Sequence, residues 1–244
     1  MHVSMQPMGD QALLASFQDE DAAACFAAAV RHAPPAGFVD VVQAYSTVAV
    51  YFTLDVTCYR EVAAHSQTLA DSNDMALVVE SSILHRIPCC YEFPLDQERV
   101  AQHTGLSVDE VIRLHTEAEY RVYAIGFCPG FPYLGYLPER LRGVPRLDTP
   151  RVRVEAGTVG LTGKQTGIYT EVRPGGWNLI GKTPLTLVSM ADGYFPLRTG
   201  DRVQFERIDE PEYRRLLGER LPERQEKKAW PQSAQRTLRE DKSE

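Results

Sequence analysis

The sequence predicts an α+β protein of two consecutive domains. Helix-like and strand-like patterns alternate up to about Tyr91, two short helices follow, and from Tyr120 onward short strand-like runs are broken by Gly and Pro. A chain of 244 residues is long enough for one large or two ordinary domains with a buried core. We therefore expect a first domain over residues 1–91, a second over residues 92–222, and a tail over residues 223–244.

The first domain is predicted to follow the order β-α-β-β-α-β. Asp19 is placed to cap the first helix, and Pro34-Pro35 would end it. This order is the ferredoxin-like arrangement, in which two helices cover one face of an antiparallel sheet. The expected elements are strand Gln11–Phe17, helix Asp19–His32, hairpin strands Phe38–Ala44 and Thr47–Phe52, helix Val56–Ala70, and strand segments Ala76–Val79 and Ile83–Tyr91.

Two short helices are expected next, one over about Asp96–His103 and one that begins after Ser107. Ser107 and Glu110 have the spacing of a capping box, which contributes about 1 kcal/mol to helix stability. His115 lies on the apolar stripe of the second helix. The helix–Gly–helix pattern resembles a DNA-binding helix-turn-helix, but acidic residues dominate its second helix and phosphates would repel it.

The remainder of the second domain is predicted to be a closed barrel or a sandwich, because many short strands alternate with turn residues. A last helix is expected from Glu210 to about Leu217, and the charged segment Arg224–Glu244 is expected to be disordered. The expected strands are Tyr120–Ile125, Val152–Ala156, Ile168–Val172, Trp177–Ile180, Leu185–Val188 and Arg202–Arg207.

Composition excludes several classes of function. A net charge of −7 argues against binding to a nucleic-acid backbone, and no apolar run is long enough to span a membrane. The segment Met1–Gln6 lacks the charged and apolar regions of a secretory signal. Five irregularly spaced cysteines indicate neither a disulfide framework nor a zinc site, so we expect reduced thiols, no metal and a cytoplasmic protein.

The segment Gly126–Pro138 is predicted to be the feature around which the second domain is organised. It holds three prolines, three glycines and five large apolar or aromatic residues, whereas ordinary surface loops are polar. Pro129-Gly130 fits the centre of a type II turn. Such a segment suits the wall of a binding cleft, formed by Phe127, Phe131 and Tyr133. The alternative is a buried connection whose aromatic rings only fill a core.

A glycine-rich segment, Gly157–Gln165, differs from a phosphate-binding Walker A loop. Five residues rather than four separate Gly157 from Gly163, and Gln165 occupies the position where Ser or Thr would hold magnesium. The residues that follow are strand-like, whereas a Walker A loop opens a helix. A glycine-rich hairpin whose backbone amides line a pocket remains open.

Several polar residues are candidates for chemistry in this domain. His115 is suited to proton transfer at neutral pH, although a histidine on an apolar face is more often a core residue. Arg146 and Arg151 are suited to clamping a carboxylate or phosphate, the alternative being a surface ion pair with Asp148. The residues expected to contact a substrate are Phe127, Pro129, Gly130, Phe131, Tyr133, Gln165, Thr166, Tyr169 and Trp177.

Six motifs in one order give the chain a family resemblance. Together they resemble the PxpB family of 5-oxoprolinase components. This family is also called the KipI family or allophanate hydrolase subunit 1, and its domain is described as the carboxyltransferase domain, subdomains C and D. The match runs from about Gln11 to Arg207. The motifs lie at His115–Val122, Gly126–Leu134, Pro145–Arg151, Ala156–Gly160, Gln165–Tyr169 and Pro174–Leu185.

The resemblance implies a small α+β domain followed by a cyclophilin-like β-barrel. It also implies two protein partners, a KipA-like protein (PxpC) and a LamB/YcsF-like protein (PxpA), and ATP as the cofactor that is consumed when 5-oxoproline is opened to glutamate. Under this hypothesis His115, Arg146 and Arg151 are the catalytic residues. The family also includes an inhibitor of a sensor histidine kinase and relatives of urea carboxylase and allophanate hydrolase, which remain alternatives.

Overall fold

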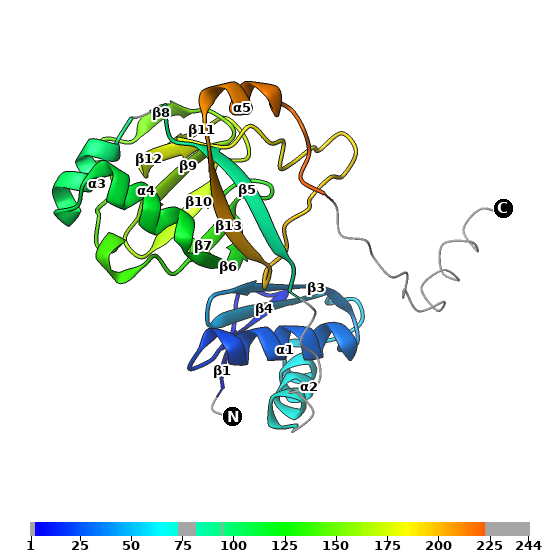
Figure 1. The fold of residues 1–244 in the computed structure, drawn as a ribbon. Coiled ribbons are helices and arrows are strands. Elements are labelled where there is room, and N and C mark those ends of the chain that lie inside the picture. The colour runs from blue at the N-terminus through cyan, green and yellow to red at the C-terminus, as the bar shows by residue number, and fades with distance from the viewer. Residues whose placement is uncertain (1–2, 73–81, 94, 223–244) are drawn as a thin grey trace, which may run out of the picture.

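The computed structural model describes residues 3–72, 82–93 and 95–222, and Figure 1 shows them as a smaller N-terminal body and a larger second body. The N-terminal body is a sheet with two helices on one side. The larger body is a β-barrel with helices outside it. The predicted tail Arg224–Glu244 and the predicted strand segment Ala76–Val79 lie outside the described residues.

The N-terminal body is a four-stranded antiparallel sheet in the order β1-β2-β4-β3. Asp19 caps the first helix as predicted, because its Oδ1 accepts a hydrogen bond from the Ala22 amide at 2.8 Å. Both helices pack on one face of the sheet, with Leu13, Phe26 and Val50 at the centre of the core. The elements are β1 (Ser4–Pro7), β2 (Ala12–Ser16), α1 (Glu20–His32), β3 (Phe38–Ala44), β4 (Thr47–Phe52) and α2 (Tyr59–Asp71).

The described residues do not complete the predicted ferredoxin-like arrangement. The edge position beside β2 is occupied by β1, a strand that the sequence analysis did not predict. The predicted segment Ile83–Tyr91 does form a strand, β5 (Leu84–Cys90), but β5 belongs to the barrel. Its assignment to the N-terminal sheet is therefore wrong. A hydrophobic pattern identifies a strand without identifying its partner, and here the partner is far away along the chain.

The barrel is closed by seven strands in the order β10-β7-β6-β13-β5-β12-β9, with β9 and β10 joined as a hairpin. The neighbouring strands β5 and β13 are parallel, and the other neighbours are antiparallel. Ile87, Phe205, Leu161 and Ile180 fill the interior. The remaining strands are β6 (Glu119–Ile125), β7 (Pro132–Gly135), β9 (Thr158–Thr162), β10 (Gln165–Ile168), β12 (Asn178–Lys182) and β13 (Arg202–Ile208).

Other strand predictions differ from the structure in detail. The predicted strand Val152–Ala156 corresponds to β8 (Arg151–Val154), which pairs with β11 (Arg173–Gly175) in a ribbon outside the barrel. Leu185–Val188 is not a strand, and only an isolated bridge joins Thr186 to Arg220. The strand expected over Ile168–Val172 lies earlier, at β10.

In the described part of the larger body, three α-helices lie outside the barrel: α3 (Gln97–Thr104), α4 (Val108–Glu117) and α5 (Glu210–Arg215). The predicted capping box is present, since the Glu110 amide donates to Ser107 Oγ at 3.2 Å and Glu110 Oε2 accepts from the Ser107 amide at 3.1 Å. Gly105 ends α3 with a left-handed φ of 70°. Among the described helices, none combines the length and the apolar character that a membrane crossing requires.

Candidate binding cleft

The predicted aromatic segment folds into a tight loop and then into β7. The Phe131 amide donates to the Cys128 carbonyl at 3.1 Å, which closes a β-turn over Pro129 and Gly130. Gly130 has φ +68°, as the predicted type II turn requires. A Cβ on Gly130 would lie 2.2 Å from Val188 Cγ2, so both the turn and the packing exclude a side chain there.

Aromatic side chains from this loop and from two later positions, Tyr169 and Trp177, line a cleft of about 260 Å³. The ring of Phe131 packs edge-to-face on Tyr169 and Trp177, with centroids 5.4 and 5.5 Å away. Gly167 lies beneath these rings, and a Cβ there would come within 2.9 Å of Phe131. The lining residues, hereafter the aromatic cleft, are Phe127, Phe131, Tyr133, Arg146, Pro150, Tyr169, Pro174, Gly175, Gly176 and Trp177.

Arg146 supplies the positive charge of the aromatic cleft. Its side chain is exposed, and it forms no ion pair with a described residue, so the expected alternative of a pair with Asp148 is not observed among these residues. Burial raises the pKa of Tyr133 and Tyr169 above the usual value for a phenol, and the nearby Arg146 partly opposes that rise. Both tyrosines therefore remain protonated at neutral pH and can donate hydrogen bonds. The cleft thus combines flat apolar walls with one guanidinium and phenolic donors.

Arg151 lies beside the aromatic cleft and faces away from it. Arg151 is the register partner of Gly175 in the β8–β11 ribbon. Its Nη2 donates to Asp96 Oδ1 at 2.7 Å, and its side chain lines a separate cavity of about 480 Å³. Asp96 Oδ2 accepts from the Leu179 amide at 2.7 Å. Arg151 Nη1 is buried and has no hydrogen-bond partner among the described residues. Arg151 therefore anchors α3 to the barrel instead of joining Arg146 in one anion site.

His115 is completely buried inside the domain and does not line the aromatic cleft. Thr166 Oγ1 donates to the Gly160 carbonyl at 3.0 Å, so it must accept the 2.9 Å bond from His115 Nε2–H. His115 Nδ1 then accepts from the Tyr91 hydroxyl at 2.8 Å. Burial lowers the pKa of His115 to about 3, and the ring is neutral at neutral pH. The burial of His115 agrees with the alternative of a core histidine, and a catalytic role for this residue stays a prediction.

The other predicted contact residues divide between the cleft and the scaffold. Thr166 is completely buried and binds His115. Pro129 and Gly130 support the loop, with the Pro129 carbonyl accepting from Thr170 Oγ1 at 2.7 Å. Gln165 pairs with Gly135, at the end of β10 that lies toward the N-terminal body. The structure thus brings Phe127, Phe131, Tyr133, Arg146, Tyr169 and Trp177 together around the cleft. The residues that do not line it are Pro129, Gly130, Gln165, Thr166, His115 and Arg151.

The β8–β11 ribbon contributes cleft residues that the sequence analysis did not assign to the site. Pro174 and Gly175 of β11, and Pro150 directly before β8, line the cleft together with the aromatic loop. A Cβ on Gly175 would lie 2.2 Å from the Tyr169 hydroxyl, so the ring reaches the rim only because this position is glycine. The run Pro174-Gly175-Gly176 was the sequence signal that could have pointed to these cleft residues. A run of turn residues, however, does not indicate which aromatic ring packs against it.

The closed barrel, the N-terminal α/β body and the motif-bearing cleft together define a class of protein. Residues 3–193 match the family described as carboxyltransferase domain, subdomain C and D. The chain belongs to this family.

Named relatives narrow the class further. The chain is 36% identical over 231 residues to a Bacillus subtilis protein named as the B subunit of 5-oxoprolinase, and this match covers 86% of the chain and 94% of that relative. The crystal structure of a protein called TTHA0988 superposes with a TM-score of 0.70 at 33% identity, over 83% of this chain and 41% of that one. The chain therefore spans well under half of that longer protein. The crystal structure of Kluyveromyces lactis urea amidolyase shares the fold. It superposes with a TM-score of 0.71 at 17% identity, over 90% of this chain and 16% of that one.

Proposed function

We propose that the chain is the PxpB component of an ATP-dependent 5-oxoprolinase, which opens 5-oxoproline to glutamate. The Bacillus subtilis relative named as the B subunit of 5-oxoprolinase supports this proposal, because the match covers nearly the whole length of both proteins. We further propose that the barrel is of the cyclophilin-like type, with the KipA-like PxpC and the LamB/YcsF-like PxpA as partners. The greater length of TTHA0988 is consistent with a second component packing on this one.

The aromatic cleft is the observation that carries the proposal. Its 260 Å³ suits a molecule smaller than a drug-sized ligand, for which pockets run from about 300 Å³ upward. The flat lactam ring of 5-oxoproline would lie against Phe131 and Trp177. Its carboxylate would pair with Arg146, whose guanidinium has no ion-pair partner among the described residues. Tyr133 and Tyr169 would donate hydrogen bonds to the ligand's oxygens.

Activation of the lactam explains the proposed need for ATP. A lactam is a stable amide, and transfer of the γ-phosphoryl group to its oxygen makes the ring carbon open to attack by water. Expulsion of the ring nitrogen then leaves an acyl phosphate, and a second water releases glutamate and phosphate. Arginine and phenolic donors near the ring would stabilise the charge that develops on oxygen. On this chain Tyr133 and Tyr169 would be these donors, while Arg146 would hold the carboxylate.

Reconstitution tests the proposal. The full chain mixed with PxpA and PxpC should hydrolyse ATP only when 5-oxoproline is present. Arg146→Ala should raise the KM for 5-oxoproline by about tenfold or more, because a charge-assisted hydrogen bond contributes about 1.5–3 kcal/mol. Arg140→Ala removes an exposed arginine that pairs with Glu110 and does not line the cleft, and it should leave that KM unchanged. Absence of any 5-oxoproline-dependent hydrolysis in the complete mixture would refute the assignment.

The rim of the cleft supports a second candidate function. Phe127 is 58% exposed although it sits in an aromatic cluster, and exposed aromatic residues are common in protein interfaces. A KipI-type inhibitor of a sensor histidine kinase would use such a rim to bind its target. That function predicts that the chain alone lowers kinase autophosphorylation and that Phe127→Ser abolishes the effect. The enzyme function predicts no effect on the kinase from the chain alone.

A further inference from the structure

The cavity of about 480 Å³ that Arg151 lines lies on the outside of the barrel, at the end where α5 and the β8–β11 ribbon meet (Figure 1). This cavity, hereafter the lateral pocket, is bounded by β8 at Arg151, by β12 at Lys182 and by α5 at Tyr213. It shares no described lining residue with the aromatic cleft. Its volume lies within the range of about 300–1,000 Å³ that is typical of pockets for small molecules.

The way in which β12 is paired explains why the lateral pocket exists. The register of β12 with β5 covers a single pair, Lys182 with Cys90. At Leu179 the place of a neighbouring strand is taken by Asp96, whose carboxylate and amide bond to the Leu179 backbone at 2.7 and 3.0 Å. The register of β12 with β9 shifts between Leu179 and Gly181, and with this bulge both Leu179 and Lys182 line the pocket outside the barrel.

The floor of the lateral pocket is apolar. Val154 and Leu179 are both buried, and they belong to the cluster of side chains that packs behind the aromatic cleft. Phe93 and Tyr213 add two rings, which meet edge-to-face with their centroids 5.0 Å apart. A hydrocarbon group on this floor leaves water, and each methylene that does so increases affinity by about fourfold.

Cations outnumber carboxylates among the residues that line the lateral pocket. The cations are Arg151, Arg153 and Lys182, and the carboxylate is Glu155. Arg153 pairs with Glu155 at 2.6 Å, and Arg151 pairs at 2.7 Å with Asp96. Lys182 forms no ion pair with a described residue. Three cations and two carboxylates leave one positive charge, which suits a single carboxylate and not a polyphosphate.

A hydroxyl group lies next to the unpaired ammonium of Lys182. Lys182 and Thr158 are register partners on β12 and β9, so their side chains leave the barrel on the same side. Thr158 is only 7% exposed, yet its hydroxyl forms no hydrogen bond with a described residue. The pocket thus has two hydrogen-bond donors side by side above its apolar floor.

We propose that the lateral pocket binds a small apolar carboxylate, with its charged end at Lys182 and Thr158 and its hydrocarbon end on the apolar floor. A neutral apolar molecule leaves the charge of Lys182 unused, and a small polar acid leaves the floor uncovered. This ligand class differs from the polar lactam of the proposed function, and the site does not depend on that function.

Calorimetric titration of the full chain with octanoate tests the proposal. One octanoate should bind per chain, about tenfold or more tightly than butyrate, because each added methylene contributes about fourfold. Octanol has the same hydrocarbon character without the charge. It should bind about tenfold or more weakly than octanoate, since a charge-assisted hydrogen bond contributes about one to two factors of ten. No binding of octanoate, or equal affinity for octanoate and octanol, would overturn the proposal.

Substitution of Lys182 tests the charged end of the site. Lys182→Gln should weaken octanoate binding by about tenfold or more and should change octanol binding by less than about twofold. Lys164→Gln is the matched control, because Lys164 is an exposed lysine that does not line the pocket, and it should leave both affinities in place. A Lys182→Gln protein that binds octanoate as tightly as the native chain would refute the site.

The aromatic cleft is the competing site for octanoate, since it also combines apolar walls with a cation. Arg146→Ala should leave the affinity for octanoate unchanged if the lateral pocket is the site, and a loss of binding in this variant would assign octanoate to the aromatic cleft. Mapping of amide chemical shifts on the native chain decides without any substitution. Octanoate should shift the amides of Val154, Leu179 and Lys182, and shifts confined to other residues would contradict the proposal.

Discussion

The buried His115 should make the stability of this protein depend on pH in a way that can be measured on one residue. Its folded pKa of about 3 lies below the value of about 6.5 for an unfolded histidine. Below pH 6.5 the unfolded chain binds a proton that the folded chain does not bind. The free energy of unfolding should therefore fall as the pH falls, and the contribution of His115 should be constant above about pH 7.

The magnitude follows from the proton difference. One full proton changes stability by about 1.4 kcal/mol per pH unit, so at pH 4.5 His115 should have removed about 2.7 kcal/mol of the stability present at about pH 8. That is a large share of a typical stability of about 5–15 kcal/mol. Urea unfolding at several pH values gives the free energy of unfolding of the native chain and of His115→Gln as a function of pH. Between pH 8 and pH 4.5 the native chain should lose more stability than the variant, by this amount.

A control and a direct observation complete the experiment. His103→Gln removes an exposed histidine from α3 and should leave the native slope in place. If His115→Gln fails to fold, an NMR titration of the native chain still decides, because the His115 ring resonances should not shift between pH 8 and pH 4.5. Equal slopes for the native chain and the folded His115 variant, or a ring that titrates near pH 6.5, would refute the reasoning.

Three further substitutions should report on the scaffold of the cleft. Gly130→Ala forces a side chain into a left-handed φ and into Val188, so urea unfolding should show a loss of about 3 kcal/mol. Asp96→Ala leaves the Arg151 guanidinium and the Leu179 amide without their acceptor, and it should cost about 3 kcal/mol in the same measurement. Gly167→Ala pushes Phe131 away and should raise the KM for 5-oxoproline in the reconstituted enzyme by about tenfold or more, as an overpacked position costs about 1–3 kcal/mol.

Matched variants control these three predictions. Gly126→Ala adds a methyl group that meets nothing closer than 4.0 Å, and it should cost much less than Gly130→Ala. Glu117→Ala breaks an exposed ion pair, which should cost less than about 1 kcal/mol. A Gly126→Ala protein that kept the native KM while Gly167→Ala lost it would tie the effect to the ring cluster. Equal losses from both glycine variants would contradict the packing argument.

Local features of this fold were predictable from the sequence because they depend on neighbours in the chain. The cap at Asp19, the capping box at Ser107, the hairpin strands Phe38–Ala44 and Thr47–Phe52, and the turn at Gly130 all occur where the sequence analysis expected them. Each of them is decided within about four residues by capping, alternation or allowed φ.

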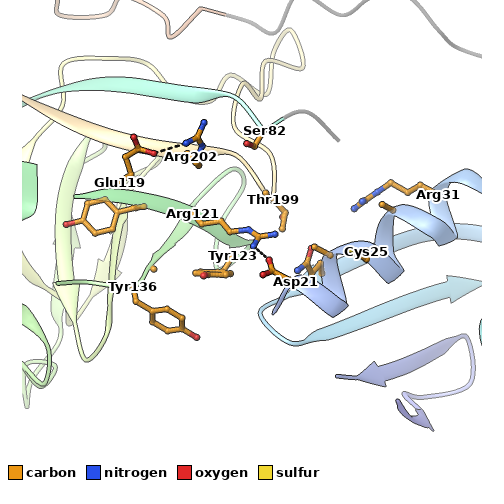
Figure 2. A pocket seen from close by; sticks show the side chains of 16 residues that line it. Asp21, Cys25, Arg31, Ser82, Glu119, Arg121, Tyr123, Tyr136, Thr199 and Arg202 are labelled. Atoms are coloured by element: carbon orange, nitrogen blue, oxygen red, sulfur yellow. Dashed lines mark hydrogen bonds and ion pairs between the residues drawn. The ribbon is translucent and has the colours of Figure 1, made fainter. Parts of the chain in front are cut away.

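Long-range features were not predictable in the same way. The strand β5 was recognised, but its pairing with β13 depends on residues 118 positions later in the chain, as in the register of Leu84 with Arg202. His115 was correctly placed on an apolar stripe, yet the pattern could not show that Tyr91 and Thr166 satisfy both ring nitrogens. The cavity of about 620 Å³ between α1 and the barrel (Figure 2) was not predicted, because Arg31, Arg121 and Arg202 come from three elements that only the fold brings together.

The parallel pairing of β5 with β13 has a consequence for biosynthesis. β5 emerges early, but the strand that covers one of its sides ends at Ile208, close to the last described residue. The N-terminal sheet, by contrast, needs only residues up to Phe52 and can form while translation continues. Until β13 has been synthesised, the nascent chain has a folded first body followed by β5 with an unpaired edge. A chaperone or an incorrect strand can bind to such an edge. Stalled chains that end before Arg202 should therefore be prone to aggregation, although their first body is already folded.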